Sequence, residues 1–253
     1  AKEHTSWMNP SEAYEAAIEG FVRAVLEQNQ GEAFCLIDGF VKEIEGAGFV
    51  NSIAQLTLKS MLPGVPDFYQ GCELWDFRLV DPDNRQPVDF AHRTAALQAL
   101  IERYETSRDL LLEEVMGSWD DRLKLFVTWR ALQTRRKYRD LFAHGGYETA
   151  EISGPLARHL FGFYRRSGNR WVLVVVPRHS QRLREKINMT TAQSLLPRSF
   201  MGSVWRDCQL QLPCGAPTVW LNELSGHELT AVDGRLPMDV ILDKSITAFL
   251  SVP

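Results

Sequence analysis

The spacing of apolar residues divides the chain into a helix-rich first part and a strand-rich second part. Before residue 62 the apolar positions recur every three or four residues, which is the period of an amphipathic helix. Asn29-Gln30-Gly31, and then Gly46 and Gly48, interrupt this period, as glycine and asparagine commonly do at helix ends. The predicted helices are Ser11 to Leu26, Phe34 to Ile44, Phe49 to Met61, Phe90 to Tyr104 and Arg122 to Tyr138, with a turn at Leu110 to Leu112.

Beyond His144-Gly145-Gly146 the helical period gives way to the alternation and β-branched runs of strands. Turn sequences such as Ser167-Gly168-Asn169 separate several of these runs. We therefore predict an antiparallel β-sandwich of roughly 100 residues. The predicted fold class is α+β, with residues 1–145 and 146–253 as its two domains. The predicted strands are His159 to Arg165, Trp171 to Val176, Phe200 to Trp205, Thr218 to Leu221 and Ile246 to Val252.

Residues 61–90 fit neither pattern. Prolines at four positions between residues 63 and 87 exclude a long helix, while the apolar content is too high for a disordered segment. We predict a short buried strand at Val65 to Tyr69 that opens into a long ordered loop. A lone strand needs a neighbour, so most of the sheet or barrel to which it belongs is expected to be absent. The segment should then either leave strand geometry or pair its edge with another molecule.

Three stretches carry a resemblance to a known family. They are AKEHTSWMNPSEAYEAAIEGFV at residues 1–22, PGVPDFYQGCELWDFRLVDPDNRQPVDF at residues 63–90, and LFAHGGY at residues 141–147 leading to VLVVVPR at residues 172–178. Together they resemble the C-terminal portion of maltooligosyl trehalose synthases, members of the α-amylase superfamily. Cys72 departs from the pattern, because threonine is expected there.

The resemblance implies that residues 1–145 form the last part of a (β/α)8 barrel with a helical insertion. It also implies an isomerase, an intramolecular transglycosylase that converts the reducing-end α-1,4 bond of maltooligosaccharides into an α,α-1,1 trehalose bond. The catalytic carboxylates would lie upstream of Ala1, so we expect no catalytic residue here and no activity from this chain alone. The expected partners are a maltooligosaccharide and the remainder of the barrel, with a homo-oligomer through the exposed barrel surface as a further expectation.

The loop after the predicted strand holds the candidate substrate-binding residues, since loops after barrel strands line the active face. Aromatic faces and planar polar groups suit sugar rings and hydroxyls. An ion pair between Asp83 and Arg85, or a Trp75 in the core, would instead be structural, but the clustering favours a site. The candidates are Asp67, Tyr69, Gln70, Glu73, Trp75, Asp83, Asn84 and Arg85. We expect Glu73, Trp75, Asp83 and Arg85 to surround one concavity with Tyr69 at its base.

Charge and motifs narrow the remaining classes. The net charge of −4 offers no basic field for nucleic acid or an anionic membrane, and no apolar stretch is long enough to span a bilayer. The four cysteines show no zinc spacing, so we expect a reduced cytoplasmic protein without metal or cofactor. Asp81 to Arg85 begins like a calcium loop but places Arg85 where an oxygen ligand belongs.

A second interpretation is a non-catalytic carbohydrate-binding or scaffold module. Trp205 or Trp220 could provide a glycan platform on the sandwich. Such platforms must be exposed, whereas core tryptophans are buried. The exposure of these two side chains therefore separates the two interpretations.

Overall fold

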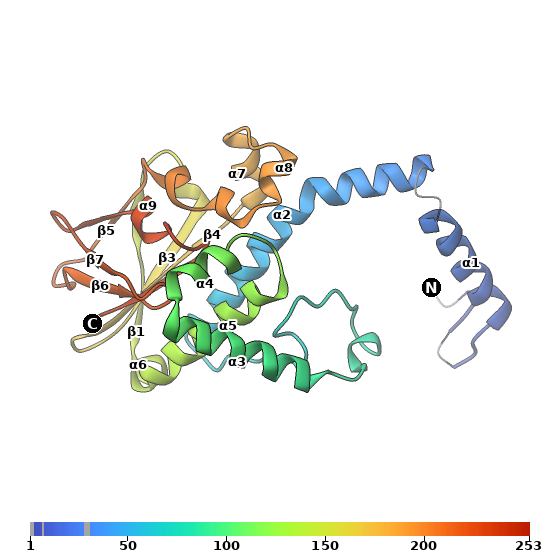
Figure 1. The fold of residues 1–253 in the computed structure, drawn as a ribbon, viewed down its shortest axis with the longest axis horizontal. Helices are drawn as coiled ribbons and strands as arrows, with labels where there is room; N and C mark the ends of the chain where they lie inside the picture. The colour runs from blue at the N-terminus through green and yellow to red at the C-terminus, as the bar shows by residue number, and fades with distance from the viewer. Residues whose placement is uncertain (1–2, 7, 28–30) are drawn as a thin grey trace. The chain divides into compact units, whose positions relative to one another are not determined.

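The computed structural model describes residues 3–6, 8–27 and 31–253, in two compact units, Ala1–Glu45 and Gly46–Pro253. The first unit contains helix α1 (Glu12–Glu27) and the beginning of α2 (Glu32–Met61). The predicted helix break at Asn29 and Gln30 lies outside the described residues. Figure 1 shows the elements in chain order. The division of the chain into domains at residue 145 stays a prediction, although the first strand does begin at Gly146.

Apolar side chains of the first unit recur at helical spacing, as the sequence pattern predicted, but they are exposed. None of the residues of α1 is buried. Phe21 is 67% exposed on α1, and Phe40 is 61% exposed on α2. Ile18, Val22, Leu26, Leu36 and Ile37 are exposed as well. Helices of this kind usually bury such a stripe against another element.

Helix α2 corrects one prediction, because it is a single helix of 30 residues where two helices were expected. Gly46 and Gly48 lie inside it. A Cβ atom at Gly46 would overlap the main-chain carbonyl of Ser194, in the short helix α8 (Thr191–Ser194). Glycine therefore allows a close approach here and does not end the helix. A glycine inside a helix costs only about 1 kcal/mol relative to alanine, which packing can offset.

Four helices follow the loop of residues 62–89. They are α3 (Phe90–Thr106), α4 (Arg108–Val115), α5 (Asp121–Lys137) and α6 (Arg139–His144). Helices α3 and α5 match their predicted ranges, and aspartates start both. Asp89 accepts a hydrogen bond from the His92 N–H, and Asp120 accepts one from the Arg122 N–H, each at 2.9 Å. The turn predicted at Leu110 to Leu112 lies within α4 and is helical.

Every strand pair of the two sheets is antiparallel. The larger sheet has the order β1-β3-β4-β9-β6-β7, and the smaller one the order β2-β5-β8. The larger sheet consists of β1 (Gly146–Thr149), β3 (Leu160–Ser167), β4 (Arg170–Pro177), β9 (Ala248–Ser251), β6 (Val219–Asn222) and β7 (Glu228–Thr230). The smaller sheet consists of β2 (Glu151–Ser153), β5 (Gln209–Gln211) and β8 (Arg235–Pro237). A mixed helix and sheet fold with antiparallel sheets is thus confirmed.

The strand predicted at Phe200 to Trp205 is wrong. This segment forms two 3₁₀ turns, η3 (Pro197–Phe200) and η4 (Gly202–Trp205). Pro197 starts the first turn, and the Trp205 indole N–H donates to the Phe200 carbonyl at 3.0 Å. This hydrogen bond joins residues five positions apart, which would be too far from each other in an extended strand. The other short elements are η1 (Asp83–Arg85), η2 (Ala157–His159), α7 (Ser180–Lys186) and α9 (Met238–Ile241).

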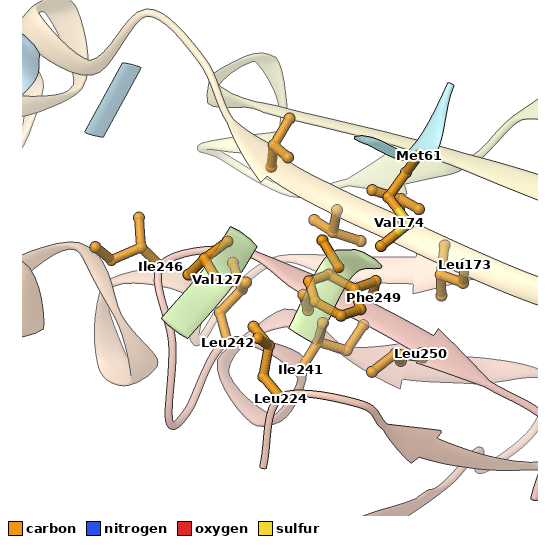
Figure 2. Close-up of a cluster of buried hydrophobic side chains, with 14 of the residues drawn as sticks. Met61, Val127, Leu173, Val174, Leu224, Ile241, Leu242, Ile246, Phe249 and Leu250 are labelled. Atoms are coloured by element: carbon orange, nitrogen blue, oxygen red, sulfur yellow. The ribbon is translucent and has the colours of Figure 1, made fainter. Parts of the chain in front are cut away.

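Helices and the larger sheet share one apolar core (Figure 2). Met61 at the end of α2 and Val127 of α5 lie in the same cluster as the β4 and β9 side chains. Leu173, Val174, Phe249 and Leu250 are fully buried. Strand β4 is buried along nearly its whole length, as its run of β-branched residues predicts. The core therefore fixes the end of α2, and with it the start of the loop that follows.

The barrel strand predicted at Val65 to Tyr69 is not observed. None of residues 62–89, all of which are described, forms a strand, and Val65 is 95% exposed. Two prolines at positions 63 and 66 remove main-chain donors, and no neighbouring strand pairs with the segment. The segment thus leaves strand geometry, which is one of the two outcomes expected of a strand without neighbours.

Candidate functional site

Trp75 anchors the loop of residues 62–89 on the helices. Its indole N–H donates to the Asp120 carbonyl at 2.9 Å, and its main-chain N–H donates to the Asp121 carboxylate at 2.7 Å. The Phe49 ring packs edge-on against Trp75, with centroids 4.8 Å apart, and stacks on Trp119. Both N–H groups of Trp75 are therefore already bonded. Trp75 therefore has the structural role that was considered for it.

Arg93, in the first turn of α3, holds the beginning of the loop. Its guanidinium donates to the Gly71 carbonyl at 3.0 Å and to the Asp89 carbonyl at 3.1 Å. It also pairs with the Glu73 carboxylate at 3.2 Å. Gly71 has a φ of +91°, and a Cβ atom there would lie 2.7 Å from the guanidinium of Arg78. Glycine is thus favoured both by the backbone conformation and by the close approach of Arg78.

Asp76 and Arg78 form a two-bond pair inside the loop. The two carboxylate oxygens of Asp76 accept from Arg78 Nε at 2.9 Å and from Nη2 at 2.6 Å, and both side chains are mostly buried. The hydrogen bonds from Arg78 lower the pKa of Asp76 to about 2. Asp76 is therefore ionised at neutral pH, and its two oxygens are fixed in position.

The turn at residues 79–86 is organised by Asp83. Its carboxylate accepts from the Leu79 N–H at 2.7 Å and from the Gln86 amide at 3.0 Å. The Asp81–Pro82 peptide bond is cis. Arg85 pairs with Asp81 through contacts of 2.6 and 2.5 Å, and not with Asp83, which was the alternative considered for it. The carbonyl oxygen of the Asn84 side chain is buried and has no partner in the described residues.

These contacts surround a polar cavity of about 440 Å³. Trp75 and Asp83 are the two predicted residues that line it. Its other lining residues are Gly71, Asp76, Phe77, Arg78, Pro87, Val88 and Arg93. Phe77 is 78% exposed. The cavity is therefore lined by two aromatic rings and several charged side chains held by hydrogen bonds, which is a lining suited to a hydroxyl-rich ligand.

The remaining predicted residues lie outside the lining of this cavity. Glu73 and Arg85 are occupied by Arg93 and Asp81, respectively. Asp67, Tyr69 and Gln70 are exposed on the irregular segment that precedes Gly71 in the chain. Of the four residues expected to surround one concavity, only Trp75 and Asp83 line the cavity, whereas Glu73 and Arg85 do not. Tyr69 is not among the lining residues and so does not form its base. Asp76, Phe77, Arg78 and Arg93 were not among the candidates.

Asp76, Phe77 and Arg78 are in the same loop as the candidates, so the density of charged and aromatic residues could have included them. Arg93 gave no such signal, because its position on a predicted helix indicates only an exposed basic residue. No group of three or more His, Cys, Asp or Glu in the described part of the chain could hold a metal ion. No helix described here is long and apolar enough to cross a membrane.

Comparison with known proteins places these elements in context. A curated Mycobacterium tuberculosis protein, provisionally named maltooligosyl trehalose synthase, is 35% identical over 182 residues, or 72% of this chain. The solved structure of maltooligosyltrehalose synthase from Arthrobacter ramosus covers 99% of the chain with a TM-score of 0.70 and 28% identity. A hypothetical maltooligosyl trehalose synthase from Sulfolobus tokodaii covers 100% with a TM-score of 0.60 and 26% identity. No protein-family model matches the chain.

The chain is similar to maltooligosyl trehalose synthases. The resemblance inferred from the three sequence stretches is therefore confirmed, and the match is to the C-terminal region of these proteins. The chain spans 20% of the length of the curated relative and 28% of the Arthrobacter ramosus structure.

The tryptophans of the sheet region bear on the second interpretation. Trp205 and Trp220 are both fully buried, and their indole N–H groups donate to the carbonyls of Phe200 and Pro217. A buried ring with a satisfied N–H offers no face to a glycan. These two residues therefore do not form a binding platform.

Proposed function

We propose that this chain is the C-terminal part of a maltooligosyl trehalose synthase of the α-amylase superfamily. The full enzyme would rearrange the reducing-end α-1,4 bond of a maltooligosaccharide into the α,α-1,1 bond of trehalose. The observation that carries the proposal is the 35% identity over 182 residues to the Mycobacterium tuberculosis relative. The Arthrobacter ramosus structure supports it over 99% of this chain. A cytoplasmic location is proposed with it.

In this proposal the chain binds substrate and does not catalyse the reaction. Retaining glycosyl transfer needs a free carboxylic acid and a free carboxylate on opposite sides of the scissile bond. In the loop, Asp76 is paired with Arg78 and Glu73 with Arg93. Both carboxylates are therefore already held in ion pairs with arginines of this chain. The catalytic groups are therefore proposed to come from the barrel residues upstream of Ala1.

The loop cavity would hold the sugar at the reducing end. After the α-1,4 bond breaks, the released glucose must stay in place and water must stay out, or hydrolysis replaces rearrangement. The exposed ring of Phe77 offers a flat apolar face, and Asp83 and Arg78 offer polar groups held by other bonds. Asp67, Tyr69 and Gln70 stay predictions as sugar contacts, since they lie outside the cavity lining.

The first test uses the chain by itself. The purified protein is incubated with maltopentaose, and the products are searched for a trehalose end. We expect none, because the proposed catalytic carboxylates are not in this chain. A trehalose-ended product would show that the chain is catalytic by itself, which would overturn this part of the proposal.

The second test places the chain in a complete enzyme. A chimera carries this chain in place of the equivalent region of the Arthrobacter ramosus synthase, and we expect it to convert maltopentaose. Within it, Phe77→Ala and Asp83→Asn should each lower kcat/KM by about tenfold, the loss expected for one contact of about 1.4 kcal/mol. Arg170→Gln, on an exposed strand end, is the control and should change kcat/KM little.

A folded chimera without activity would contradict the proposed function. An active chimera in which Phe77→Ala and Asp83→Asn are both silent would contradict only the role of the loop. These outcomes separate the family function from the residue assignment.

The exposed apolar side chains of the first unit support the proposed need for further polypeptide. Phe21 and Phe40 are each more than half exposed, and soluble monomers seldom leave such residues in continuous stripes. By itself the chain should therefore self-associate through these helices. Size-exclusion chromatography with light scattering tests this, and a strict monomer over a wide concentration range would contradict it.

A further inference from the structure

A second cavity of about 310 Å³ lies between α2, the loop and α5, and shares no lining residue with the cavity described above. Helix α2 contributes Ser52, Gln55, Leu56 and Lys59, whose spacing puts them on one face of the helix. The loop contributes Cys72, and α5 contributes Lys124. Two lysine side chains therefore line one cavity, together with polar side chains that carry a hydroxyl, an amide and a thiol.

Lys124 is half-buried, and burial lowers its pKa. Its ammonium donates to the Leu74 carbonyl at 2.8 Å and lies 5.4 Å from the centre of the Trp75 ring. One of its three N–H donors is satisfied by this bond. Two carboxylates act on it electrostatically, but Asp76 is paired with Arg78, and Asp121 accepts from the Trp75 N–H. Lys124 makes no salt bridge with any residue that the structure describes.

Lys59 has no carboxylate partner either. Its ammonium lies 3.9 Å from the centre of the Phe68 ring, a cation–π contact, and it forms no salt bridge within the described residues. It also acts on Lys124 as a like charge and contributes to lowering the Lys124 pKa. Two nearby cations without a common anion repel each other, and an anion between them would convert this repulsion into attraction.

We propose that this cavity binds a phosphate group between Lys59 and Lys124, with the Ser52 hydroxyl and the Gln55 amide as further donors. A phosphate has the oxygens and the charge that two ammonium groups and neutral donors can bind together. The volume is in the range of small-molecule sites, so the group could be free phosphate or the phosphate of a small ester such as a sugar phosphate. This inference does not rest on the proposed enzyme function.

Cys72 provides a reporter, because it lines the cavity beside the two lysines. Cys35→Ser and Cys214→Ser remove the two exposed thiols, and Cys208 is buried. The rate at which N-ethylmaleimide modifies Cys72 is then measured at constant ionic strength. Inorganic phosphate, glucose 6-phosphate and glucose are titrated in turn, with chloride replaced as needed.

We expect saturable protection of Cys72 by inorganic phosphate, by glucose 6-phosphate or by both, and none by glucose. Protection by inorganic phosphate identifies the free anion as a sufficient ligand, whereas protection by the ester alone identifies a phosphorylated small molecule. Lack of protection by either phosphate compound would overturn the proposal.

Lysine variants decide whether the two cations are responsible. Lys59→Gln and Lys124→Gln should each raise the concentration for half-protection by about tenfold, as for the loss of one charge-assisted contact. Lys244 lines a different cavity, so Lys244→Gln is the matched control. This variant should leave the concentration for half-protection unchanged. The rates with and without ligand are compared within each variant, because losing an ammonium also alters the thiol.

Lys59 is exposed, so Lys59→Gln keeps the test valid even where Lys124→Gln fails to fold. Protection that is the same in Lys59→Gln and in the parent would overturn the assignment of the site.

Discussion

The guanidinium of Arg93 donates a 3.0 Å hydrogen bond to the main-chain carbonyl of Gly71, across 22 positions of the sequence. The same side chain reaches the Glu73 carboxylate and the carbonyl of Asp89 at the start of its own helix. One arginine on α3 therefore holds the turn at Gly71, where the irregular segment of residues 62–70 leads into the residues that line the cavity. The position of Asp76, Phe77 and Arg78 depends on that point.

Replacing Arg93 by glutamine should loosen the loop without unfolding the protein. Three hydrogen bonds from one partly buried guanidinium are lost, so we expect the free energy of unfolding to fall by about 1–2 kcal/mol. Urea denaturation measures this value, and limited proteolysis should show faster cleavage between residues 71 and 89. Arg85→Gln is the control, since its pair with Asp81 is mostly exposed and should contribute less than about 1 kcal/mol. Equal losses in both variants would contradict the role given to Arg93.

Gly71→Ala should destabilise the protein by more than Gly64→Ala. Both glycines have φ between +90° and +115°. At Gly71 a Cβ atom would also lie 2.7 Å from the guanidinium of Arg78, whereas at Gly64 there is nothing within 4 Å. The shared backbone strain is about 1–2 kcal/mol, and displacement of Arg78 adds to it at Gly71 only. Thermal and urea unfolding of the two variants, compared side by side, give the difference. A similar loss of unfolding free energy in both variants would show that the Arg78 side chain moves aside at no measurable cost.

The sequence predicted those elements whose signals are local. Helices α3 and α5 were found because apolar spacing and an aspartate at the N-terminus coincide in each, at Asp89 and Asp120. Strand β4 was found because its β-branched run is continuous. The prediction that Gly46 ends a helix was wrong. Glycine is needed there because the main chain of Ser194, 148 positions away in the sequence, leaves no room for a Cβ atom. No local pattern contains such a contact.

The candidate site was likewise predictable only where the signal is local to one stretch of sequence. Trp75 and Asp83 were identified from the density of polar and aromatic residues in one loop, and both line the cavity. Glu73 and Arg85 lie in the same polar loop, but Glu73 forms an ion pair with Arg93, and Arg85 forms one with Asp81. Which carboxylate pairs with which arginine depends on how the loop folds back on α3. Composition and spacing do not contain that information.

The stability of the loop should depend on acid pH through Asp76. The pKa of its carboxyl is lowered from the ordinary 3.8 to about 2 by the Arg78 hydrogen bonds. Between these values the folded protein binds fewer protons than the unfolded chain, so the contribution of Asp76 is complete above about pH 4 and is lost as the pH falls through about 2. The difference in unfolding free energy between the parent and Asp76→Asn should therefore narrow over this window. Arg78→Gln should move the Asp76 titration, followed by NMR, back toward 3.8. An unchanged titration would contradict the assigned cause.

Glu223, which is almost fully buried, joins the helices to the larger sheet. Its carboxylate accepts from Lys137 of α5 at 2.8 Å and from the Ser251 hydroxyl of β9 at 2.6 Å, and pairs with Arg130 at 3.3 Å. Its carbonyl accepts from Arg130 at 2.8 and 2.6 Å and from the Tyr104 hydroxyl at 3.4 Å. The side chain is therefore the only counter-charge that Arg130 has within the described residues.

Glu223→Gln should lower the free energy of unfolding by about 2–3 kcal/mol. Removing one partner of a buried pair typically costs about 3–5 kcal/mol, but Arg130 keeps its bonds to the carbonyl and Lys137 is half exposed, so the loss is smaller. Asp140→Asn is the control, because its pair with Arg170 is long and exposed and should change stability by less than about 0.5 kcal/mol. In the double variant with Arg130→Gln the losses should be less than additive, since the two residues act as one pair. Additive losses would show that Arg130 is held by the carbonyl alone.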